Sequence, residues 1–255
     1  MTDATRGGRL GLPSAVRGCL FDMDGVLTRT AEVHAAAWKQ TFDEFLRYWS
    51  TRTGIRARPF DAHDDYDRYV DGRSRADGTR GFLASRDIRL PEGDPDDPPG
   101  SPTVSGLSNR KNDILLEKLA TDGVRVFDDA VEYVKAVRAA ALPCAVVSAS
   151  ANTEQVLRAA GISDLFDSRV DGLLARKRHL QGKPAPDMYL AGAEALGLPP
   201  EGAAVFEDAL AGVEAGRAGG FGFVVGVDRV GQGDDLRAHG ADVVVERLTE
   251  LLGAP

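Results

Sequence analysis

Residues 16–26 read Val-Arg-Gly-Cys-Leu-Phe-Asp-Met-Asp-Gly-Val, a short apolar run that ends in two aspartates and a glycine. The run over 16–21 has the length and composition of a buried parallel strand. Ligands of an open α/β sheet bind beyond the carboxyl ends of its strands, so carboxylates that follow a strand are placed for function. Side chains two apart on an extended segment share a face, which lets Asp22 and Asp24 address one ligand. Gly25 then permits a sharp turn.

Short apolar runs and helical patterns alternate along much of the remaining chain. Further strands are expected at 145–147, 203–206, 221–227 and 243–245, and amphipathic helices at 130–140, 153–160, 187–196 and 209–218. Strands that alternate with helices pair in parallel, with helices covering the sheet. The sequence therefore predicts an α/β fold with a doubly wound parallel sheet, that is, a Rossmann-like core.

One interval, 31–123, breaks this alternation. Its patterns are helical: a first helix over 31–49 carries an aromatic stripe and a second lies near 114–119. The stripe consists of Trp38, Phe42, Phe45, Leu46 and Trp49, and the second helix is marked by Ile114, Leu115 and Leu119. We expect an inserted helical cap domain over 31–123, with a core formed by 1–30 and 124–255. Within the cap, the prolines and acids of 91–102 predict an exposed loop.

Composition excludes several classes of protein. The chain is 43% hydrophobic and 27% charged, which excludes an intrinsically disordered protein. It carries 31 Lys and Arg against 39 Asp and Glu, a net charge of −8, so we expect no nucleic acid partner and no anionic lipid surface. The longest apolar stretch, 139–147, is too short to span a bilayer and contains Pro143.

The N-terminus and the cysteines indicate a cytoplasmic protein. Residues 1–18 lack the uninterrupted apolar region of a secretion signal, and we expect them to form a frayed tail. Cys19 and Cys144 lie in apolar segments without metal-ligand spacing, which favours buried free thiols in a reducing compartment.

Three further polar signals follow later predicted strands. Ser148 comes after 145–147, Lys183 lies in a proline-flanked segment, and Glu207-Asp208 come directly after 203–206. Each alone has a common structural explanation: serine caps helices, lysine is usually solvated, and acids favour helix N-termini. Because the signals occur in order and near strand ends, the sequence predicts that they converge on one site.

Four segments together resemble the ordered motifs of the haloacid dehalogenase-like phosphotransferases. They are FDMDGVLT at 21–28, VVSAS at 146–150, GKPAPD at 182–187 and FEDALAGVEAG at 206–216. Within that superfamily, residues 21–38 most resemble the β-phosphoglucomutase family, and the inserted lobe resembles that family's helical cap. The dehalogenases of the superfamily lack the second aspartate, so Asp24 favours phosphoryl transfer over cleavage of a carbon–halogen bond.

The resemblance implies roles for the charged residues. Asp22 is expected to be the nucleophile that forms an aspartyl phosphate, and Asp24 the general acid and base. Ser148 and Lys183 are expected to hold the transferring oxygens. A phosphate ester carries about two negative charges and repels a carboxylate. Mg²⁺ would relieve that repulsion, and it suits Asp22 and Asp208 as ligands. By resemblance the backbone carbonyl of Asp24 is a further ligand, and Glu207 lies beside the metal.

The same resemblance indicates a hexose phosphate as the substrate, with β-glucose 1-phosphate converted to glucose 6-phosphate. The expected substrate-binding residues are Thr30, His34, Trp38, Arg75, Ser150 and Asn152. For three of them a structural role is the alternative: filling a groove for His34, packing in the cap for Trp38, and solvation for Arg75.

The cap also departs from the family pattern. Asp71 stands where the family shows a lysine, although the nearby Arg73 could restore the charge, and Gly78 stands where a serine is usual. A sugar-phosphate phosphatase with the same nucleophile therefore stays open as an alternative, as does a non-catalytic phosphate-binding module. The expected partner is a small-molecule sugar phosphate, and the expected state is a monomer or weak dimer.

Overall fold

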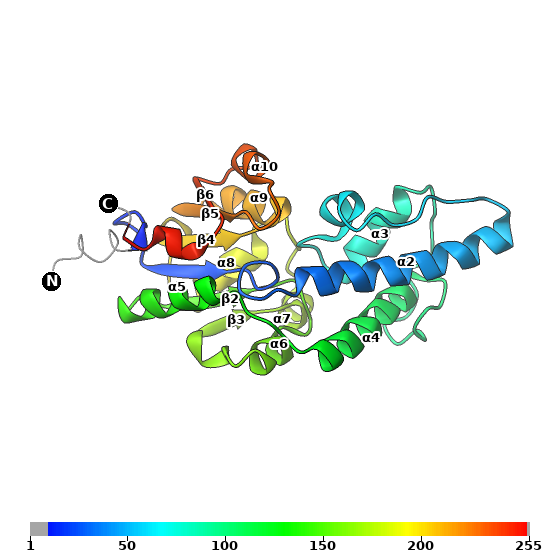
Figure 1. Ribbon diagram of the computed structural model, residues 1–255, viewed down its shortest axis with the longest axis horizontal. Helices are drawn as coiled ribbons and strands as arrows, with labels where there is room; N and C mark the ends of the chain where they lie inside the picture. Colours follow the sequence, from blue (N-terminus) through cyan, green and yellow to red (C-terminus); the bar gives the residue numbers. More distant parts are fainter. Residues whose placement is uncertain (1–9, 254–255) are drawn as a thin grey trace. The chain divides into compact units, whose positions relative to one another are not determined.

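The computed structural model of the protein describes residues 10–253 (Figure 1). These residues divide into two compact units. One, called the core below, holds the described residues up to Arg29 and those from Val124 onward; the other, called the cap, spans Thr30–Gly123.

The core is built on a six-stranded parallel sheet within the described part of the chain. Its spatial order is β3-β2-β1-β4-β5-β6, so the chain starts in the middle and winds outward in both directions (Figure 1). The strands are β1 Gly18–Phe21, β2 Cys144–Val147, β3 Ser168–Val170, β4 Ala203–Glu207, β5 Phe223–Val227 and β6 Val243–Val245. This topology confirms the predicted doubly wound α/β fold.

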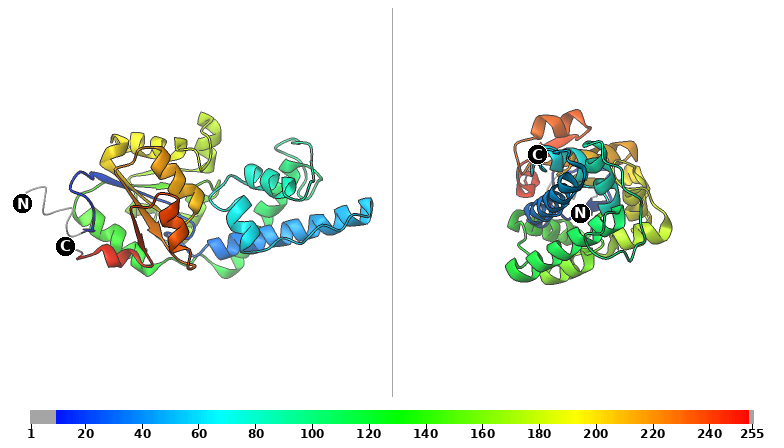
Figure 2. Two further views of the ribbon diagram at one scale, coloured as in Figure 1. Left: turned by 90° about the horizontal axis from the view of Figure 1, so that it is seen from above. Right: turned by 90° about the vertical axis from the view of Figure 1, so that its right-hand side faces the viewer.

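Helices cover the two faces of this sheet (Figure 2). They are α5 Asp128–Ala139, α6 Thr153–Ala159, α7 Gly172–Arg178, α8 Asp187–Ala195, α9 Leu210–Ala218 and α10 Gly233–Ala238, with short 3₁₀ turns η3 Ser163–Leu165, η4 Pro200–Gly202 and η5 Leu248–Leu251. On one face Leu20 and Val205 pack in a cluster with residues of α8 and α9. On the other, Phe21 stacks on Phe206 with ring centroids 4.4 Å apart, and Tyr133 of α5 meets both rings. Because both faces are buried, the strands read as continuous apolar runs.

The beginning of the chain differs from the sequence prediction. The frayed tail was expected over 1–18, of which 1–9 lie outside the described residues. From residue 10 onward the prediction is wrong: Leu10, Leu12 and Val16 are buried, and the Tyr133 hydroxyl donates to the Leu10 carbonyl at 2.8 Å. The apolar side chains of this segment pack against the core, and that burial outweighs the flexibility that its glycines would otherwise give it.

The two cysteines are buried free thiols, as predicted. Cys19 and Cys144 are register partners on the adjacent strands β1 and β2. Burial raises the pKa of the Cys144 thiol to about 12, and the nearby Asp167 carboxylate adds to the shift. Both thiols therefore stay protonated and behave as small apolar side chains.

The cap consists of helices around an aromatic cluster. Its elements are α2 Ala31–Thr53, the π-helical turn η2 Tyr66–Val70, α3 Arg75–Ala84 and α4 Val104–Asp122. The predicted stripe on α2 is buried at Trp38, Phe42, Phe45 and Leu46, and Phe42 stacks on Trp38 and on Phe82 of α3. Residues 91–102 form no helix or strand and are mostly exposed, which confirms the predicted loop.

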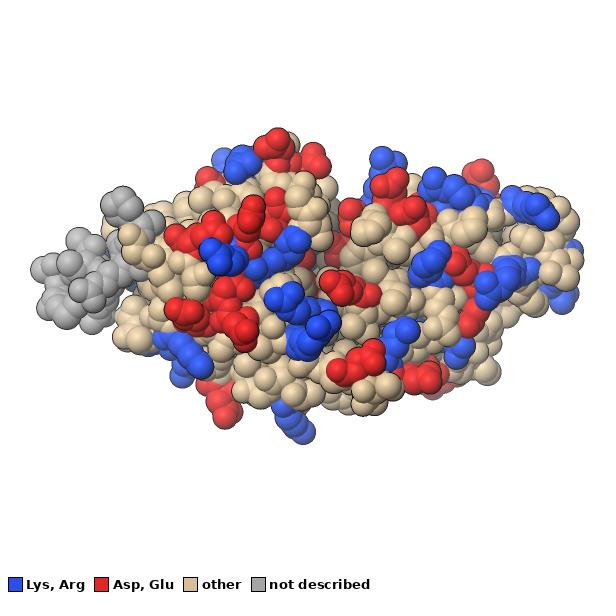
Figure 3. Space-filling model, viewed as in Figure 1, with Lys and Arg blue, Asp and Glu red and all other residues tan. Residues whose placement is uncertain are grey.

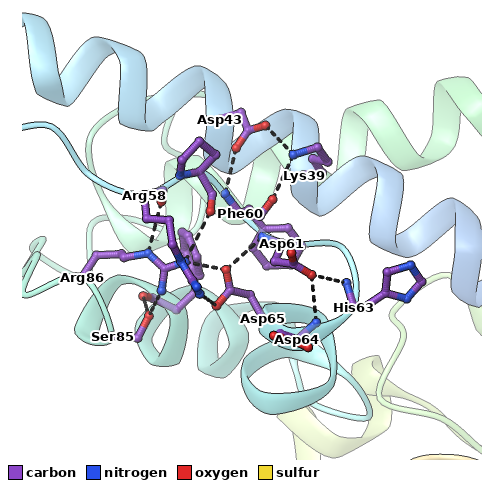
Figure 4. Close-up of polar contacts among 12 residues, drawn as sticks. Lys39, Asp43, Arg58, Phe60, Asp61, His63, Asp64, Asp65, Ser85 and Arg86 are labelled. Carbon is purple, nitrogen blue, oxygen red and sulfur yellow. Dashed lines mark hydrogen bonds and ion pairs between the residues drawn. The ribbon is translucent and has the colours of Figure 1, made fainter.

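A polar network fixes the segment 58–65 of the cap (Figure 4). Asp65 is 1% exposed and accepts hydrogen bonds from Arg58 at 3.0 Å, from Arg86 and from the backbone amide of Asp61 at 2.9 Å. Burial alone would raise the pKa of the Asp65 carboxyl, but the amide and the two guanidinium groups outweigh it and hold that pKa below its usual range. Asp65 thus stays ionised and ties this segment to the end of α3.

No helix within residues 10–253 could span a bilayer, and no large basic patch is seen on the face that Figure 3 shows. Within 10–253 no helix is both long and apolar enough to cross a membrane. On the face that Figure 3 shows, acidic and basic side chains are interspersed.

Candidate active site

The carboxyl ends of β1 and β4 bring two acidic side chains together. Phe21 and Phe206 are register partners, and the backbone amide of Asp22 donates to the Phe206 carbonyl at 3.0 Å. Asp22 and Glu207 are therefore next to each other on neighbouring strands. By the two-residue period of a strand, Asp22 shares the face of Leu20 and Glu207 that of Val205. Both carboxylates thus lie on the face covered by α8.

Lys183 bridges these two carboxylates from the loop before α8. Its Nζ donates to Asp22 Oδ1 at 2.5 Å and to Glu207 Oε1, and the side chain is fully buried. Burial lowers the pKa of Lys183, but the two carboxylates raise it by more, so the pKa lies above its ordinary value and the ammonium stays charged. The solvated surface lysine considered from the sequence is thereby excluded. Lys183 precedes a cis peptide bond to Pro184.

Glu207 also binds two further donors. The Tyr189 hydroxyl of α8 donates to Glu207 Oε1 at 2.8 Å, and the Ala209 amide donates to Oε2 at 3.1 Å. Sequence reasoning missed Tyr189, because a tyrosine among the apolar residues of a helix normally signals packing alone. Three protein donors, Lys183, Tyr189 and the Ala209 amide, therefore bind the two carboxylate oxygens of Glu207.

Asp24 and Ser148 approach each other across β1 and β2. Ser148 Oγ lies 3.4 Å from Asp24 Oδ2 and accepts a hydrogen bond from the Ser150 amide at 3.1 Å. The alternative of a helix N-cap is wrong for Ser148, since α6 begins at Thr153 with Asn152 as its N-cap residue. The Asn152 amide donates in turn to Ser150 Oγ at 3.2 Å, so both predicted substrate residues of this loop follow Ser148 in one ordered turn.

Asp208 packs against the turn that follows Asp24. Gly25 has a φ of +91°, and a Cβ built there would lie 1.7 Å from Asp208 Oδ2. The close approach requires glycine for both conformation and space. Asp22, Glu207 and Asp208 are buried and each offers a carboxylate oxygen within 4.8 Å of the others. We call these three residues the acidic cluster.

The acidic cluster fits a divalent cation. Burial raises the pKa of Asp22 well above its ordinary value, and Glu207 and Asp24 raise it further, while Lys183 opposes them. The acidic cluster concentrates negative charge in a buried place, and the Lys183 ammonium pairs with two of its members, Asp22 and Glu207. Buried negative charge is costly unless cations balance it. Hard oxygen donors of this kind are the ligands that Mg²⁺ prefers.

The cap brings together a second group of polar side chains. Lys111 of α4 is 1% exposed, its Nζ lies 3.0 Å from His34 Nδ1 and 5.1 Å from the centroid of the Trp38 ring. His34 and Trp38 lie one turn apart on α2, and the Thr30 carbonyl accepts from the His34 amide at 2.8 Å. Sequence reasoning missed Lys111; the signal available was its position one helical turn before the apolar Ile114 and Leu115.

Arg75, the remaining predicted substrate residue, begins α3. Its Nη1 donates to the Ser108 carbonyl of α4 at 3.3 Å, and Thr79 and Ser108 share a buried hydrogen bond of 3.2 Å. The side chain is half-buried rather than fully solvated.

The structure therefore groups Asp22, Asp24, Ser148, Lys183, Glu207 and Asp208 in the core, and His34 and Trp38 in the cap.

This fold and its buried acidic cluster define an enzyme of the phosphotransferase and phosphatase class. The chain belongs to the haloacid dehalogenase-like hydrolase family, whose model matches residues 16–220. It is 56% identical over 246 residues to the β-phosphoglucomutase of Mycobacterium tuberculosis, covering 95% of this chain and 94% of that protein. It is 28% identical to hexitol phosphatase A of Escherichia coli, over 92% of this chain and 93% of that one. The fold is similar to that of the crystal structure of β-phosphoglucomutase from Clostridium difficile, with a TM-score of 0.72 and 24% identity over 92% of this chain and 93% of the other.

Proposed function

We propose that the protein is a Mg²⁺-dependent β-phosphoglucomutase that interconverts β-glucose 1-phosphate and glucose 6-phosphate through a phosphoaspartate. The observation that carries the chemistry is the buried pair of Asp22 and Lys183, 2.5 Å apart, beside Asp208. The similarity to the mycobacterial β-phosphoglucomutase along nearly the whole chain supports the substrate. Asp22, Asp208 and the Asp24 carbonyl would hold the ion, with Glu207 beside it.

In the first half-reaction a carboxylate oxygen of Asp22 attacks the phosphorus of a bisphosphorylated sugar. The bond from phosphorus to the sugar oxygen breaks, and Asp24 gives its proton to that oxygen. In the second half-reaction Asp24 takes the proton from the hydroxyl of a sugar monophosphate as the hydroxyl oxygen attacks the phosphoaspartate. The nucleophile Asp22 is thereby restored, and no phosphoryl group reaches water.

The other residues of the site handle charge. Lys183 and the Ser148 hydroxyl stabilise the negative charge that spreads over the transferring oxygens. Mg²⁺, when bound, neutralises part of the phosphate charge that would otherwise repel Asp22. In the cap, we propose that Thr30, His34, Trp38 and Arg75 recognise the sugar and its non-transferring phosphate, together with Ser150 and Asn152 of the core.

The test is to incubate the purified protein and Mg²⁺ with β-glucose 1-phosphate and a trace of the glucose 1,6-bisphosphate. Glucose 6-phosphate and free phosphate are followed separately, with Asp24→Asn as the inactive reference. The proposal requires that glucose 6-phosphate forms with little phosphate release. Dominant phosphate release would overturn the mutase in favour of a phosphatase, and no turnover of any sugar phosphate would leave only a binding module.

A further inference from the structure

The loop between β5 and α10, residues 228–232, contacts the backbone of the turn that follows Asp24. Arg229 donates from Nε to the Gly25 carbonyl and from Nη2 to the Val26 carbonyl, both at 3.4 Å. Its guanidinium carbon lies 3.9 Å from the centroid of the Phe127 ring, and its side chain is only 12% exposed. The arginine is thus held in place while it holds two successive carbonyls of the turn.

The charge of Arg229 is balanced inside the core. Nη2 pairs with Asp129 Oδ2 at 3.1 Å, and Nη1 donates to the Glu246 carbonyl at 2.6 Å. Because the Asp129 carboxylate neutralises the guanidinium, Arg229 acts on the site mainly by fixing the position of the turn and not through long-range charge.

The same loop contacts the segment that carries Asp208. Gln232 Nε2 donates to the Asp208 carbonyl at 2.8 Å. The loop itself is fixed by Asp228, whose Oδ1 accepts from the amides of Val230, Gly231 and Gln232 at 3.2, 2.6 and 2.9 Å. One ordered loop therefore donates hydrogen bonds to main-chain oxygens of two segments of the site, the turn at Gly25 and Val26 and the segment at Asp208.

We propose that Arg229 and Gln232 are positioning residues for phosphoryl transfer. Arg229 fixes the turn after Asp24, which sets the place of the general acid and base, and Gln232 fixes the backbone of Asp208, which sets the place of a metal ligand. The inference rests on the proposed function of Asp24 and Asp208. Displacing a catalytic group by about 1 Å can cost 100-fold in rate, and residues that hold metal ligands typically affect metal affinity 10–100-fold.

The two residues should therefore differ in which quantity they affect most. Arg229→Met keeps much of the apolar stem and removes the donors; we expect kcat at saturating Mg²⁺ to fall about 10-fold, with a smaller rise in the Kd for Mg²⁺ than in Gln232→Leu, because the Asp24 carbonyl next to this turn is a proposed ligand of the ion. Gln232→Leu keeps the volume and removes the amide; we expect the Kd for Mg²⁺ to rise about 10-fold. The Kd is measured by calorimetric titration with Mg²⁺ alone, so this readout does not depend on turnover.

Matched controls are Arg237→Met on α10 and Gln155→Leu on α6, both at exposed positions of the core. Each should match the wild type in kcat and in the Kd for Mg²⁺. If Arg229→Met fails to fold, Arg229→Lys keeps the charge beside Asp129 but lacks the forked donors, and it carries the same expectation for kcat.

The inference is overturned if either variant behaves like its control. It is also overturned if kcat and Mg²⁺ affinity fall together in each variant in proportion to its loss of unfolding free energy, because that pattern is general destabilisation. A wild type without phosphoryl transfer would instead overturn the proposed function. In that case the Mg²⁺ titration of Gln232→Leu still decides the inference, and an unchanged Kd would refute it.

Discussion

At the scale of single residues, Lys183 has two roles. It neutralises Asp22 and Glu207, and in the proposed reaction it also stabilises the transferring oxygens. A buried ammonium is costly unless it is paired, and here two carboxylates provide the pairing. The ammonium is thus placed and charged before any substrate binds, which is the condition for electrostatic stabilisation of a transition state.

Replacing Lys183 should remove this stabilisation. We expect Lys183→Met to lower kcat at least about 100-fold, because it removes a donor to the transferring oxygens and leaves two buried carboxylates unpaired. Lys177→Met on α7, an exposed position, is the control and should keep wild-type kcat. Steady-state kinetics of both variants checks the prediction, and equal rates would refute the role of Lys183.

The position and type of a residue explain which functional residues could be predicted from the sequence. Asp22, Asp24 and Glu207-Asp208 follow apolar runs, so their position alone marks them. Lys111 and Tyr189 were missed because a helical lysine is usually solvated and a tyrosine in an apolar pattern usually packs. Their polar contacts are made with residues far away in the chain, and a helical pattern carries no information about those partners.

At the scale of elements, the turn after β1 is set by the contact between Gly25 and Asp208. A side chain at position 25 would collide with the Asp208 carboxylate and would also strain a backbone with a φ of +91°. We expect Gly25→Ala to raise the Kd for Mg²⁺ at least about 10-fold, as loss of a supporting contact to a metal ligand does.

Gly54→Ala, at the end of α2, is the control that distinguishes the collision with Asp208 from the strain of a positive φ. Gly54 has a φ of +74°, and no atom lies within 4 Å of a Cβ built there. Both variants lose unfolding free energy through the positive φ, by about 1 kcal/mol. Only Gly25→Ala should weaken Mg²⁺ binding in a calorimetric titration; an unchanged Kd would contradict the proposed place of the ion.

In the cap, Asp65 is the polar group on which the segment 58–65 depends. Asp65→Asn leaves the largely buried Arg86 without its charged partner, and we expect it to cost about 3 kcal/mol of unfolding free energy at neutral pH. Glu92→Gln removes an exposed ion pair of the same lobe and should cost less than about 1 kcal/mol.

The effect of Asp65 depends on pH with a definite sign. Its folded-state pKa is below its unfolded value, so its stabilisation is fully present above the unfolded pKa of about 4 and is lost as the pH falls through the folded pKa. Urea unfolding of wild type and Asp65→Asn at several pH values measures this. The difference between them should shrink below about pH 4, and a constant difference would show that the carboxylate charge is not the cause.

The elements that the sequence did not predict are short or polar. β3 is three residues long and contains Ser168 and Arg169, and α7 ends in three basic residues. Neither has an apolar pattern strong enough to detect. The six-residue helix α10 was not predicted either. The core strands and helices that were predicted have observed bounds within two residues of the expected ones, and β6 matches 243–245, because their apolar residues form the buried pattern that the sequence shows.

At the scale of the whole molecule, the order of strands could not be derived from the sequence. Alternation of strands and helices predicts a parallel sheet, but only long-range packing decides that β1 lies between β2 and β4. That neighbourhood is what joins Asp22 to Glu207 on one side and Asp24 to Ser148 on the other. Motif order along the chain indicated convergence, while the partners and distances needed the structure.

Binding of Mg²⁺ should stabilise the whole protein, because a ligand that binds the folded state alone shifts the unfolding equilibrium. We expect the Tm to rise by several degrees in Mg²⁺ relative to a chelator, with no rise in Asp208→Asn. Melting curves recorded by circular dichroism in both conditions check this. A rise of the same size in Asp208→Asn would place the ion elsewhere.

In the proposed reaction Asp22 accepts the phosphoryl group. The most direct measurement is transfer of labelled phosphate from the glucose 1,6-bisphosphate to the protein, followed by quenching and mapping of the modified peptide. We expect a label on Asp22 that requires Mg²⁺ and is absent from Asp22→Asn. Label on another residue, or formation of glucose 6-phosphate by Asp22→Asn at the wild-type rate, would contradict it.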